Sequence, residues 1–136
     1  MKKYLLDTSV LAAFLNKRPG TISLIKPWIS ANEVTTSLLV YGEVIEYLKN
    51  KPSFKSHQKA ARDLLKAISP YSLSVSVVEL YADIRLSLRR GKLIGDIDTL
   101  IAATALNHNL TLVTIDPDFK RVPDLKLMLL TRDQLY

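Results

Sequence analysis

Acidic residues at separated positions are the side chains of this sequence that best fit a catalytic role: Asp7, Glu43, the pair Asp96 and Asp98, and Asp116. Carboxylates that come within about 4 Å of one another repel by roughly 4 kcal/mol per pair at an effective dielectric constant near 20. A cluster of them therefore persists only if a divalent cation neutralises it or if the carboxylates take up protons. Hard cations such as Mg²⁺ and Mn²⁺ bind carboxylate oxygens, keep several waters and suit phosphate chemistry. If these acids converge in the fold, the chemistry that they indicate is metal-assisted hydrolysis of a phosphodiester.

Other kinds of site find no support in the sequence. The absence of Cys excludes disulfides, thiolate zinc sites, iron–sulfur clusters and cysteine nucleophiles. No HExxH, GxxxxGKS, GxxxxGKT or GxGxxG pattern occurs. His57 lies in a basic helix start and His108 between two Asn residues at a helix end, so neither indicates a Ser-His-Asp triad. No apolar run reaches the roughly 18 residues of a membrane span, and the absence of Cys makes the cytoplasm the expected location.

Short apolar stretches alternate with helical patterns along the whole chain. We predict strands at residues 3–6, 34–36, 71–75, 110–114 and 125–130, and helices at residues 10–15, 21–30, 38–49, 56–69, 77–90 and 96–107. Parallel strands need such crossover helices, so the expected fold class is α/β, a three-layer α/β/α sandwich with a mostly parallel central sheet. The length fits a single domain, residues 1–136. Ligands in these folds bind at the carboxyl ends of the strands, which is where Asp7 and Asp116 lie.

Asp7 also has a purely structural interpretation, because an Asp between a strand and a helix is often a helix cap. Thr8 or Ser9 is able to cap the helix instead, which would release Asp7 to point across the strand ends. The other hydroxyl would then orient a carboxylate or a metal-bound water. The sequence leaves both roles of Asp7 open.

Glu43 lies at the edge of the apolar arc of its predicted helix. At about 100° per residue it falls beside Tyr47, whereas Glu46 falls on the opposite side and is expected to face solvent. A carboxylate at the edge of an apolar arc is placed to reach a cleft. The alternative is a surface ion pair with a lysine such as Lys49 or Lys51.

Asp96 and Asp98 both lie where a helix begins, a position at which the helix dipole favours negative charge. We expect Asp96 to be the cap and Asp98 to lie on the first turn, with Ala102 and Ala105 behind it on the same face. These small residues let the helix pack close to the sheet, which would carry Asp98 near the strand ends.

Asp116 has two interpretations as well. It follows a predicted strand and precedes Pro117, and Asp-Pro is a common turn opening. Asp118 competes with it for a place in an acidic site.

Four motifs follow one another along the chain: LLDTSV at residues 5–10, YGEV at 41–44, GDIDTLIAATA at 95–105 and TLVTID at 111–116. Together they resemble the PIN-domain family, in particular the VapC-type toxins of toxin–antitoxin pairs. The resemblance implies an α/β/α sandwich and an endoribonuclease that depends on Mg²⁺ or Mn²⁺. The positions that match the acidic residues of the family are Asp7, Glu43, Asp98 and Asp116. Asp98 is preferred to Asp96 because Asp98 directly precedes the TLIAATA run.

The resemblance also implies a role for each side chain. The implied metal-ligating residues, acting directly or through water, are Asp7, Asp98 and Asp116. Glu43 would orient or deprotonate the attacking water. Ser9 and Thr114 match hydroxyl positions that support the acidic centre in the family. The implied partners are an RNA substrate, a cognate antitoxin protein and a second copy of the chain in a homodimer.

The charge balance agrees with a polyanionic partner. Lys and Arg number 19 against 13 Asp and Glu, a net charge of +6. An acidic pocket would repel RNA, so a rim of basic residues is expected around it. The candidates for this rim are Lys49, Lys51, Lys55, Arg89, Arg90, Lys92, Lys120 and Arg121.

Two other functions fit parts of the same pattern. A non-catalytic RNA- or protein-binding module would keep the fold and use the acids as helix caps. A phosphatase with an aspartyl nucleophile also places an Asp after its first strand, but it predicts a second Asp two residues later. This sequence has Ser9 at that position, which disfavours the phosphatase.

Overall fold

Four short parallel strands form one sheet in the computed structural model, which describes all of residues 1–136. The strands are β1 (Tyr4–Leu6), β2 (Val34–Thr36), β3 (Thr111–Thr114) and β4 (Leu127–Leu129). Their order across the sheet is β2-β1-β3-β4, and every neighbouring pair is parallel. All residues of β2 and nearly all of β1 and β3 are buried, as expected for parallel strands covered on both faces.

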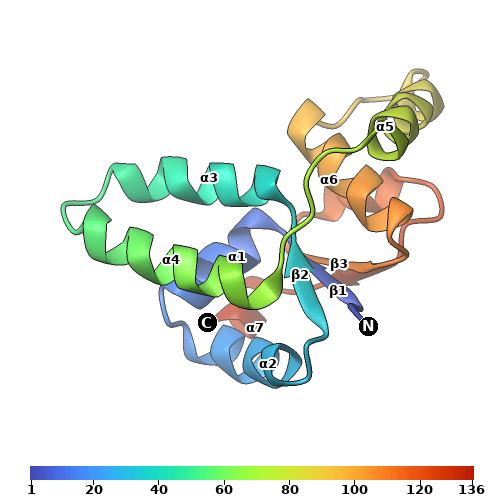
Figure 1. The fold of residues 1–136 in the computed structure, drawn as a ribbon. Helices are drawn as coiled ribbons and strands as arrows, with labels where there is room; N and C mark the ends of the chain where they lie inside the picture. Colours follow the sequence, from blue (N-terminus) through green and yellow to red (C-terminus); the bar gives the residue numbers. More distant parts are fainter.

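Helices cover both faces of this sheet (Figure 1). They are α1 (Thr8–Leu15), α2 (Pro19–Ser30), α3 (Leu38–Lys49), α4 (Phe54–Ile68), α5 (Val75–Leu88), α6 (Asp96–Asn107) and the short α7 (Arg132–Leu135), with a 3-10 helix η1 at Pro117–Arg121. Helices α5 and α6 lie on one side, and α1, α2 and α4 lie on the other (Figure 1). The predicted three-layer α/β/α sandwich is therefore confirmed.

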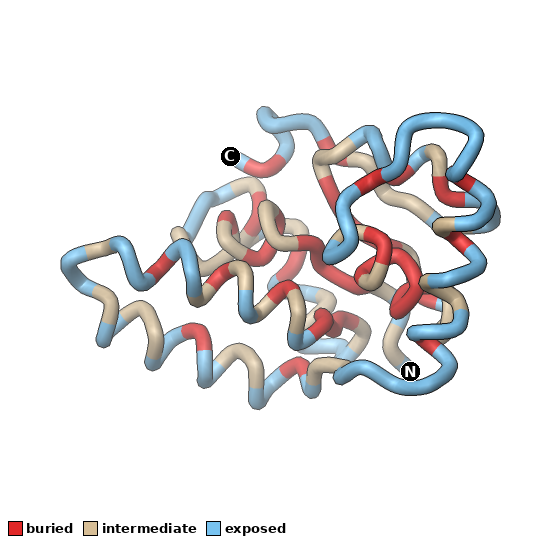
Figure 2. The backbone as a smooth tube through the Cα atoms, turned by 90° about the horizontal axis from the view of Figure 1, so that it is seen from above, coloured by how far each residue is buried: buried red, intermediate tan, exposed pale blue.

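Burial is concentrated where the three layers meet. Figure 2 shows the buried segments in the middle of the molecule, while the hairpin of α3 and α4 extends from it with mostly intermediate or exposed residues. Ala102, Ala103 and Ala105 of α6 are completely buried, so that helix packs close against the sheet as its small residues predict. No helix has the length and apolar content that a membrane crossing requires.

The strand predicted at residues 71–75 is wrong. Only Tyr71 pairs with the sheet edge, through an isolated bridge to Ser37 in which its amide donates to the Thr36 carbonyl. The chain then turns into α5, because the Ser74 hydroxyl accepts a hydrogen bond from the Val77 amide and caps the helix. The alternation of apolar residues and Ser in this segment therefore reflects a capped helix start.

The C-terminal helix α7 is fixed against the start of α2. The Gly20 amide donates to the Tyr136 carbonyl at 2.7 Å, and the Thr21 hydroxyl donates to the Leu135 carbonyl. A Cβ atom on Gly20 would lie 2.5 Å from the Gln134 carbonyl oxygen, so only glycine allows this approach. The contact holds α7 beside the helices that follow β1 and β2.

Candidate active site

The carboxyl ends of β1 and β3 bring Asp7 and Thr114 together. The Thr114 hydroxyl donates to Asp7 Oδ2 at 2.6 Å, and the same hydroxyl accepts a hydrogen bond from the Asp116 amide at 3.1 Å. Asp7 is only 6% exposed, which makes it the one carboxylate residue in the buried class. Two strand ends that are 107 residues apart in sequence are thus joined through one hydroxyl group.

The expected alternative for Asp7, a helix cap, is not what the side chain does. Asp7 occupies the position before α1, but its carboxylate makes no capping hydrogen bond. The prediction that Thr8 or Ser9 caps the helix is also wrong, since α1 already begins at Thr8. The Asp7 carboxylate accepts a hydrogen bond from the Thr114 hydroxyl across the sheet.

Glu43 reaches the same edge of the sheet from α3. The Thr8 hydroxyl donates to Glu43 Oε1 at 2.5 Å. Glu43 is half-buried and forms no ion pair with a lysine, whereas Glu46 is exposed as predicted. Sequence reasoning allowed one of two hydroxyls to orient a carboxylate, and the structure identifies Thr8 as the residue that does so.

Asp98 lies on the first turn of α6 and is half-buried. Burial raises the pKa of its carboxyl to about 6, and the negative charges of Asp7, Glu43 and Asp116 add to the increase. Burial likewise raises the pKa of Asp7, assisted by Glu43 and Asp116 and opposed by the Thr114 hydrogen bond. The carboxylates of four separate elements therefore act on one another, and none of them is paired with a cation.

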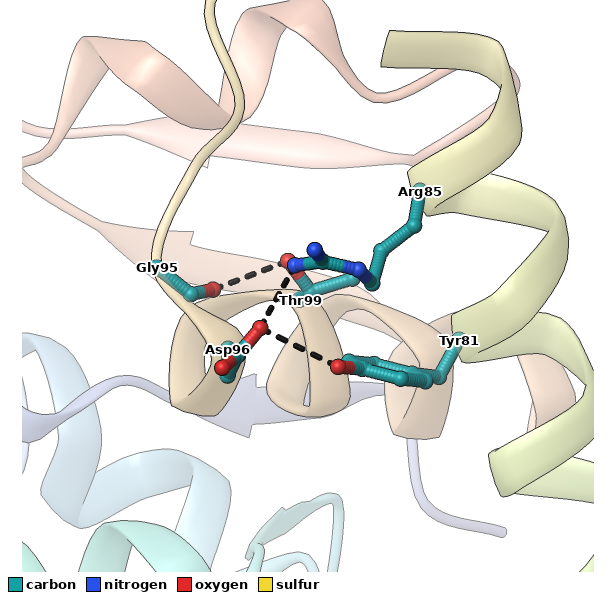
Figure 3. Close-up of polar contacts among 5 residues, drawn as sticks. All are labelled: Tyr81, Arg85, Gly95, Asp96 and Thr99. Carbon is teal, nitrogen blue, oxygen red and sulfur yellow. Dashed lines mark hydrogen bonds and ion pairs between the residues drawn. The ribbon is translucent and has the colours of Figure 1, made fainter. Parts of the chain in front are cut away.

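Asp96 is separated from this group although it is only two residues from Asp98. Its carboxylate accepts hydrogen bonds from the Arg85 guanidinium at 2.6 Å and the Tyr81 hydroxyl at 3.0 Å, both on α5 (Figure 3). The prediction that Asp96 caps α6 is wrong, because Gly95 occupies the cap position and its carbonyl accepts from the Thr99 hydroxyl (Figure 3). The two partners of Asp96 were missed, although the spacing of Tyr81 and Arg85 by one helical turn was a signal for them.

Asp116 and Asp118 were the two candidates for a place in the acidic site, and the structure gives them different surroundings. Asp116 Oδ1 accepts from the Asp118 amide at 2.9 Å and caps η1, so the predicted turn opening is present. Asp116 nevertheless raises the pKa of Asp98 more than Asp118 does, and Asp118 does not figure among the causes of the raised pKa of Asp7. Asp118 is exposed, and Asp116 is the better placed of the two.

The donor chemistry of this group fits a hydrated hard cation. No three His, Cys, Asp or Glu side chains are arranged to hold a metal ion among them directly. Mg²⁺ commonly keeps several waters and needs only one or two direct carboxylates. Carboxylates that are buried or half-buried, that repel one another and that pair with no cation fit such an ion.

The basic residues predicted to form a rim are mostly exposed to solvent. None of the eight predicted rim residues takes part in an ion pair. Six of them are exposed, and Lys51 and Arg121 are half-buried. Lys51 donates to the Asn16 side chain at 3.2 Å and lies over the Tyr47 ring.

Comparison with known proteins identifies the fold. The family model for the PIN domain matches residues 4–125. The chain belongs to the PIN-domain family. Within this family it is 30% identical over 128 residues to Ribonuclease VapC2 of Rickettsia felis, an alignment that covers 91% of this chain and 95% of that protein.

Several solved structures have the same architecture. The VapBC2 complex of Rickettsia felis bound to a DNA fragment from its promoter contains a chain with a TM-score of 0.83 and 27% identity, covering 93% of this chain and 97% of that one. A chain of FitAcB from Neisseria gonorrhoeae gives a TM-score of 0.75 at 26% identity, covering 92% and 96%. A chain of DNA-bound VapBC from Salmonella typhimurium shares the fold, with a TM-score of 0.82 and 20% identity. This match covers 94% of this chain and 98% of that one. The predicted membership of the PIN-domain family is confirmed, and the chain is a homologue of VapC ribonucleases.

Proposed function

We propose that the chain, acting as one nuclease domain over residues 1–136, is a Mg²⁺- or Mn²⁺-dependent endoribonuclease that hydrolyses RNA phosphodiester bonds. The observation that carries the proposal is the group of acids at the strand ends, where Asp7 accepts from Thr114 and Glu43 accepts from Thr8. The half-buried Asp98 belongs to this group, since Asp7 and Glu43 contribute, after burial, to its raised pKa. Such a group of unpaired carboxylates is unfavourable for the fold alone and is useful for binding a dication. The relative named Ribonuclease VapC2 supports the choice of RNA as the substrate.

The proposed roles follow from the contacts of each side chain. Asp7, Asp98 and Asp116 would hold the cation, directly or through water, and the cation would supply Lewis acidity and lower the pKa of a bound water. Thr114 fixes Asp7 through its hydrogen bond, so that the buried carboxylate keeps one orientation. Glu43 is held at Oε1 by Thr8, and its Oε2 is the proposed acceptor of the proton from the attacking water. Ser9, the neighbour of Thr8, is proposed as a further hydroxyl that supports the acidic group.

We propose in addition that the protein is the toxin of a type II toxin–antitoxin pair, acting in the cytoplasm and inhibited by a cognate antitoxin. Relatives solved as VapBC complexes support an antitoxin partner. A homodimer is part of the proposal because α5 carries Val75, Val78 and Leu86 with 75%, 48% and 59% exposure, more apolar surface than a helix facing only solvent needs.

Incubation of the purified protein with total RNA, in Mg²⁺ or in EDTA, tests the nuclease. We expect scission in Mg²⁺ and none in EDTA, and a loss of at least about 100-fold in the Asp7→Asn variant. Retained folding of that variant is checked by circular dichroism. A non-catalytic binding module with the same fold predicts that RNA stays intact in every sample. Equal cleavage by wild type and Asp7→Asn, in preparations freed of contaminating nuclease, would refute the assignment of Asp7.

A further inference from the structure

A cavity of about 330 Å³ adjoins the acidic group. Thr8 and Ser9, which directly follow Asp7, line one end, and Ile115, which directly precedes Asp116, lies there too. The cavity then follows α1 as far as Asn16, which lies about 12 Å along the helix axis from Thr8 at 1.5 Å per residue. The cavity therefore begins at residues that flank Asp7 and Asp116, although none of the four acids lines it.

The walls of this cavity differ in charge from the acidic group beside it. None of its 12 lining residues is Asp or Glu, while two of them, Arg18 and Arg132, are cationic. Neither arginine forms an ion pair. Ala12 and Ala13 line the wall on α1, and their small side chains leave the space open. A ligand that passes from the acids into the cavity thus moves from a carboxylate environment to one that favours anions.

One wall carries an aromatic ring in a position suited to stacking. Tyr47 follows Glu43 by one turn of α3, lines the cavity and is 48% exposed. The Lys51 ammonium lies 4.7 Å from the ring centroid, and it also donates to the Asn16 side chain at 3.2 Å. A hydrogen bond from Lys51 and its charge lower the pKa of the Tyr47 hydroxyl. The ring is thereby held by its neighbours while half of its surface stays accessible.

The two arginines are positioned by the C-terminal segment. The Arg18 guanidinium lies 4.4 Å from the centroid of the Tyr136 ring, a cation–π contact that restricts its orientation. Arg132 is the first residue of α7, and the contacts of Gly20 and Thr21 hold that helix in place. A pair of unpaired guanidinium groups on a fixed wall suits the binding of phosphate.

We propose that this cavity binds one nucleotide of single-stranded RNA beside the scissile phosphate, with its base stacked on Tyr47 and its phosphate held by Arg18 and Arg132. The proposal rests on the proposed nuclease function and adds the part of the substrate that the acids do not bind. Stacking of a base on an aromatic ring and charge pairing with phosphate are the two ordinary means of binding single strands. Because stacking accepts any base, the cavity contributes affinity and substrate position, with little choice of sequence.

Titration of a short fluorescein-labelled single-stranded RNA, followed by fluorescence anisotropy in EDTA, tests binding without cleavage. We expect Tyr47→Leu to weaken affinity about 5- to 100-fold and Tyr47→Phe to retain it, since the phenyl ring still stacks. Arg132→Gln should reduce the slope of log affinity against log salt by about 0.7, the effect of one lost phosphate contact to a single strand, whereas Tyr47→Leu should leave that slope unchanged. Arg62→Gln is the matched control, because Arg62 is exposed on α4 and does not line the cavity.

The outcomes separate this inference from the nuclease proposal. The inference would be overturned if Tyr47→Leu kept the wild-type affinity for RNA, or if Arg62→Gln and Arg132→Gln lost affinity equally. It would also be overturned if the variants weakened binding of a partner polypeptide and left RNA binding unchanged. In Mg²⁺, we expect Tyr47→Leu to raise KM with little change in kcat, the pattern of lost binding energy. If Tyr47→Leu cleaved RNA with an unchanged KM, the proposed role of the cavity would be refuted and the nuclease proposal would stand. Absence of cleavage by wild type, with the binding pattern intact, would refute the nuclease and retain the cavity as an RNA site. Thermal unfolding of each variant verifies its fold.

Discussion

Asp96 and Asp98 lie two residues apart on the first turn of α6, yet their surroundings are opposite. Asp96 is exposed, and it is paired with the Arg85 guanidinium and hydrogen-bonded to the Tyr81 hydroxyl (Figure 3). Asp98 is half-buried, faces other carboxylates and has its pKa raised to about 6 by burial first and by these neighbours second. Both positions offer the same helix dipole, so the dipole does not account for the difference.

The surroundings of a carboxylate differ according to whether its charge serves the fold or a proposed function. A carboxylate that serves only the fold has its charge neutralised by donors, as Arg85 and Tyr81 do for Asp96. Asp98 has no cationic partner, and its environment opposes its ionisation. An unfavourable environment of this kind persists where the charge has a use, here the proposed binding of a cation.

The largest difference between these two acids is expected when each carboxylate is neutralised in turn. We expect Asp98→Asn to lower RNA cleavage in Mg²⁺ by at least about 100-fold, because it removes a proposed ligand from the group. Asp96→Asn, the matched control on the same turn, should stay within a fewfold of wild type. Initial rates on one labelled RNA measure both. Equal losses in the two variants would mean that the start of α6 matters as a whole and that Asp98 has no separate role.

A second large effect is expected at the hydroxyl that bridges the strand ends. Thr114→Val keeps the shape of a buried side chain but removes the donor to Asp7 and the acceptor of the Asp116 amide. A hydrogen bond to a charged group contributes about 1.5–3 kcal/mol, so we expect a loss of roughly 10- to 100-fold in cleavage. Thr104→Val is a suitable control, since the buried hydroxyl of Thr104 bonds only to the Leu100 carbonyl within α6. If Thr104→Val lowers the rate as much as Thr114→Val, the effect comes from the core.

Much of this site was predictable because it depends on the ends of parallel strands. The apolar runs before Asp7 and Asp116 predicted strands, and strand ends on one edge of a sheet bring these residues together. The apolar arc of α3 correctly separated Glu43 from the exposed Glu46. Local periodicity therefore predicts which residues face the sheet edge.

Side-chain partners could not be predicted in the same way, because they depend on contacts between elements that are distant in sequence. Thr8 and Glu43 are 35 residues apart, and the pairing of Asp96 with α5 depends on how two helices pack. The misassigned strand at residues 71–75 has a different, local cause, since the Ser74 hydroxyl caps α5 and this cap outweighs the alternating pattern. Each helix cap or interhelical ion pair gives only a weak signal in the sequence. Which of them form depends on how the elements pack.

The raised pKa of Asp98 predicts how stability depends on pH when metal is removed. The folded protein keeps a proton on Asp98 up to about pH 6, whereas the unfolded chain loses it near the ordinary value of 3.8. The native state therefore binds more protons in this window, and stability falls as pH rises from about 4 to 6. The residue is half-buried, so solvent screening reduces the effect to about 1 kcal/mol, or roughly 3 °C in Tm.

Thermal unfolding in EDTA between about pH 4 and pH 6 measures this dependence. Asp98→Asn should show a smaller decrease than wild type, with the remainder due to Asp7, whose pKa is raised as well. Asp96→Asn should keep the wild-type decrease. Added Mg²⁺ should restore stability most at the upper end of the range, where the carboxylates are ionised. A stability that rises with pH in EDTA would contradict the raised pKa values of Asp98 and Asp7.

The smallest expected effect belongs to the paired carboxylate. Arg85→Gln removes the cation that faces Asp96, in an ion pair whose side chains are 36% and 67% exposed. Exposed pairs contribute about 0.2–1 kcal/mol, so urea unfolding of Arg85→Gln, Asp96→Asn and the double variant should give a coupling energy within that range. The coupling should decrease at high salt because the pair is screened, and RNA cleavage should stay near the wild-type rate. A tenfold loss of cleavage in Arg85→Gln with unchanged stability would show that the pair positions α6, and through it Asp98, for the reaction.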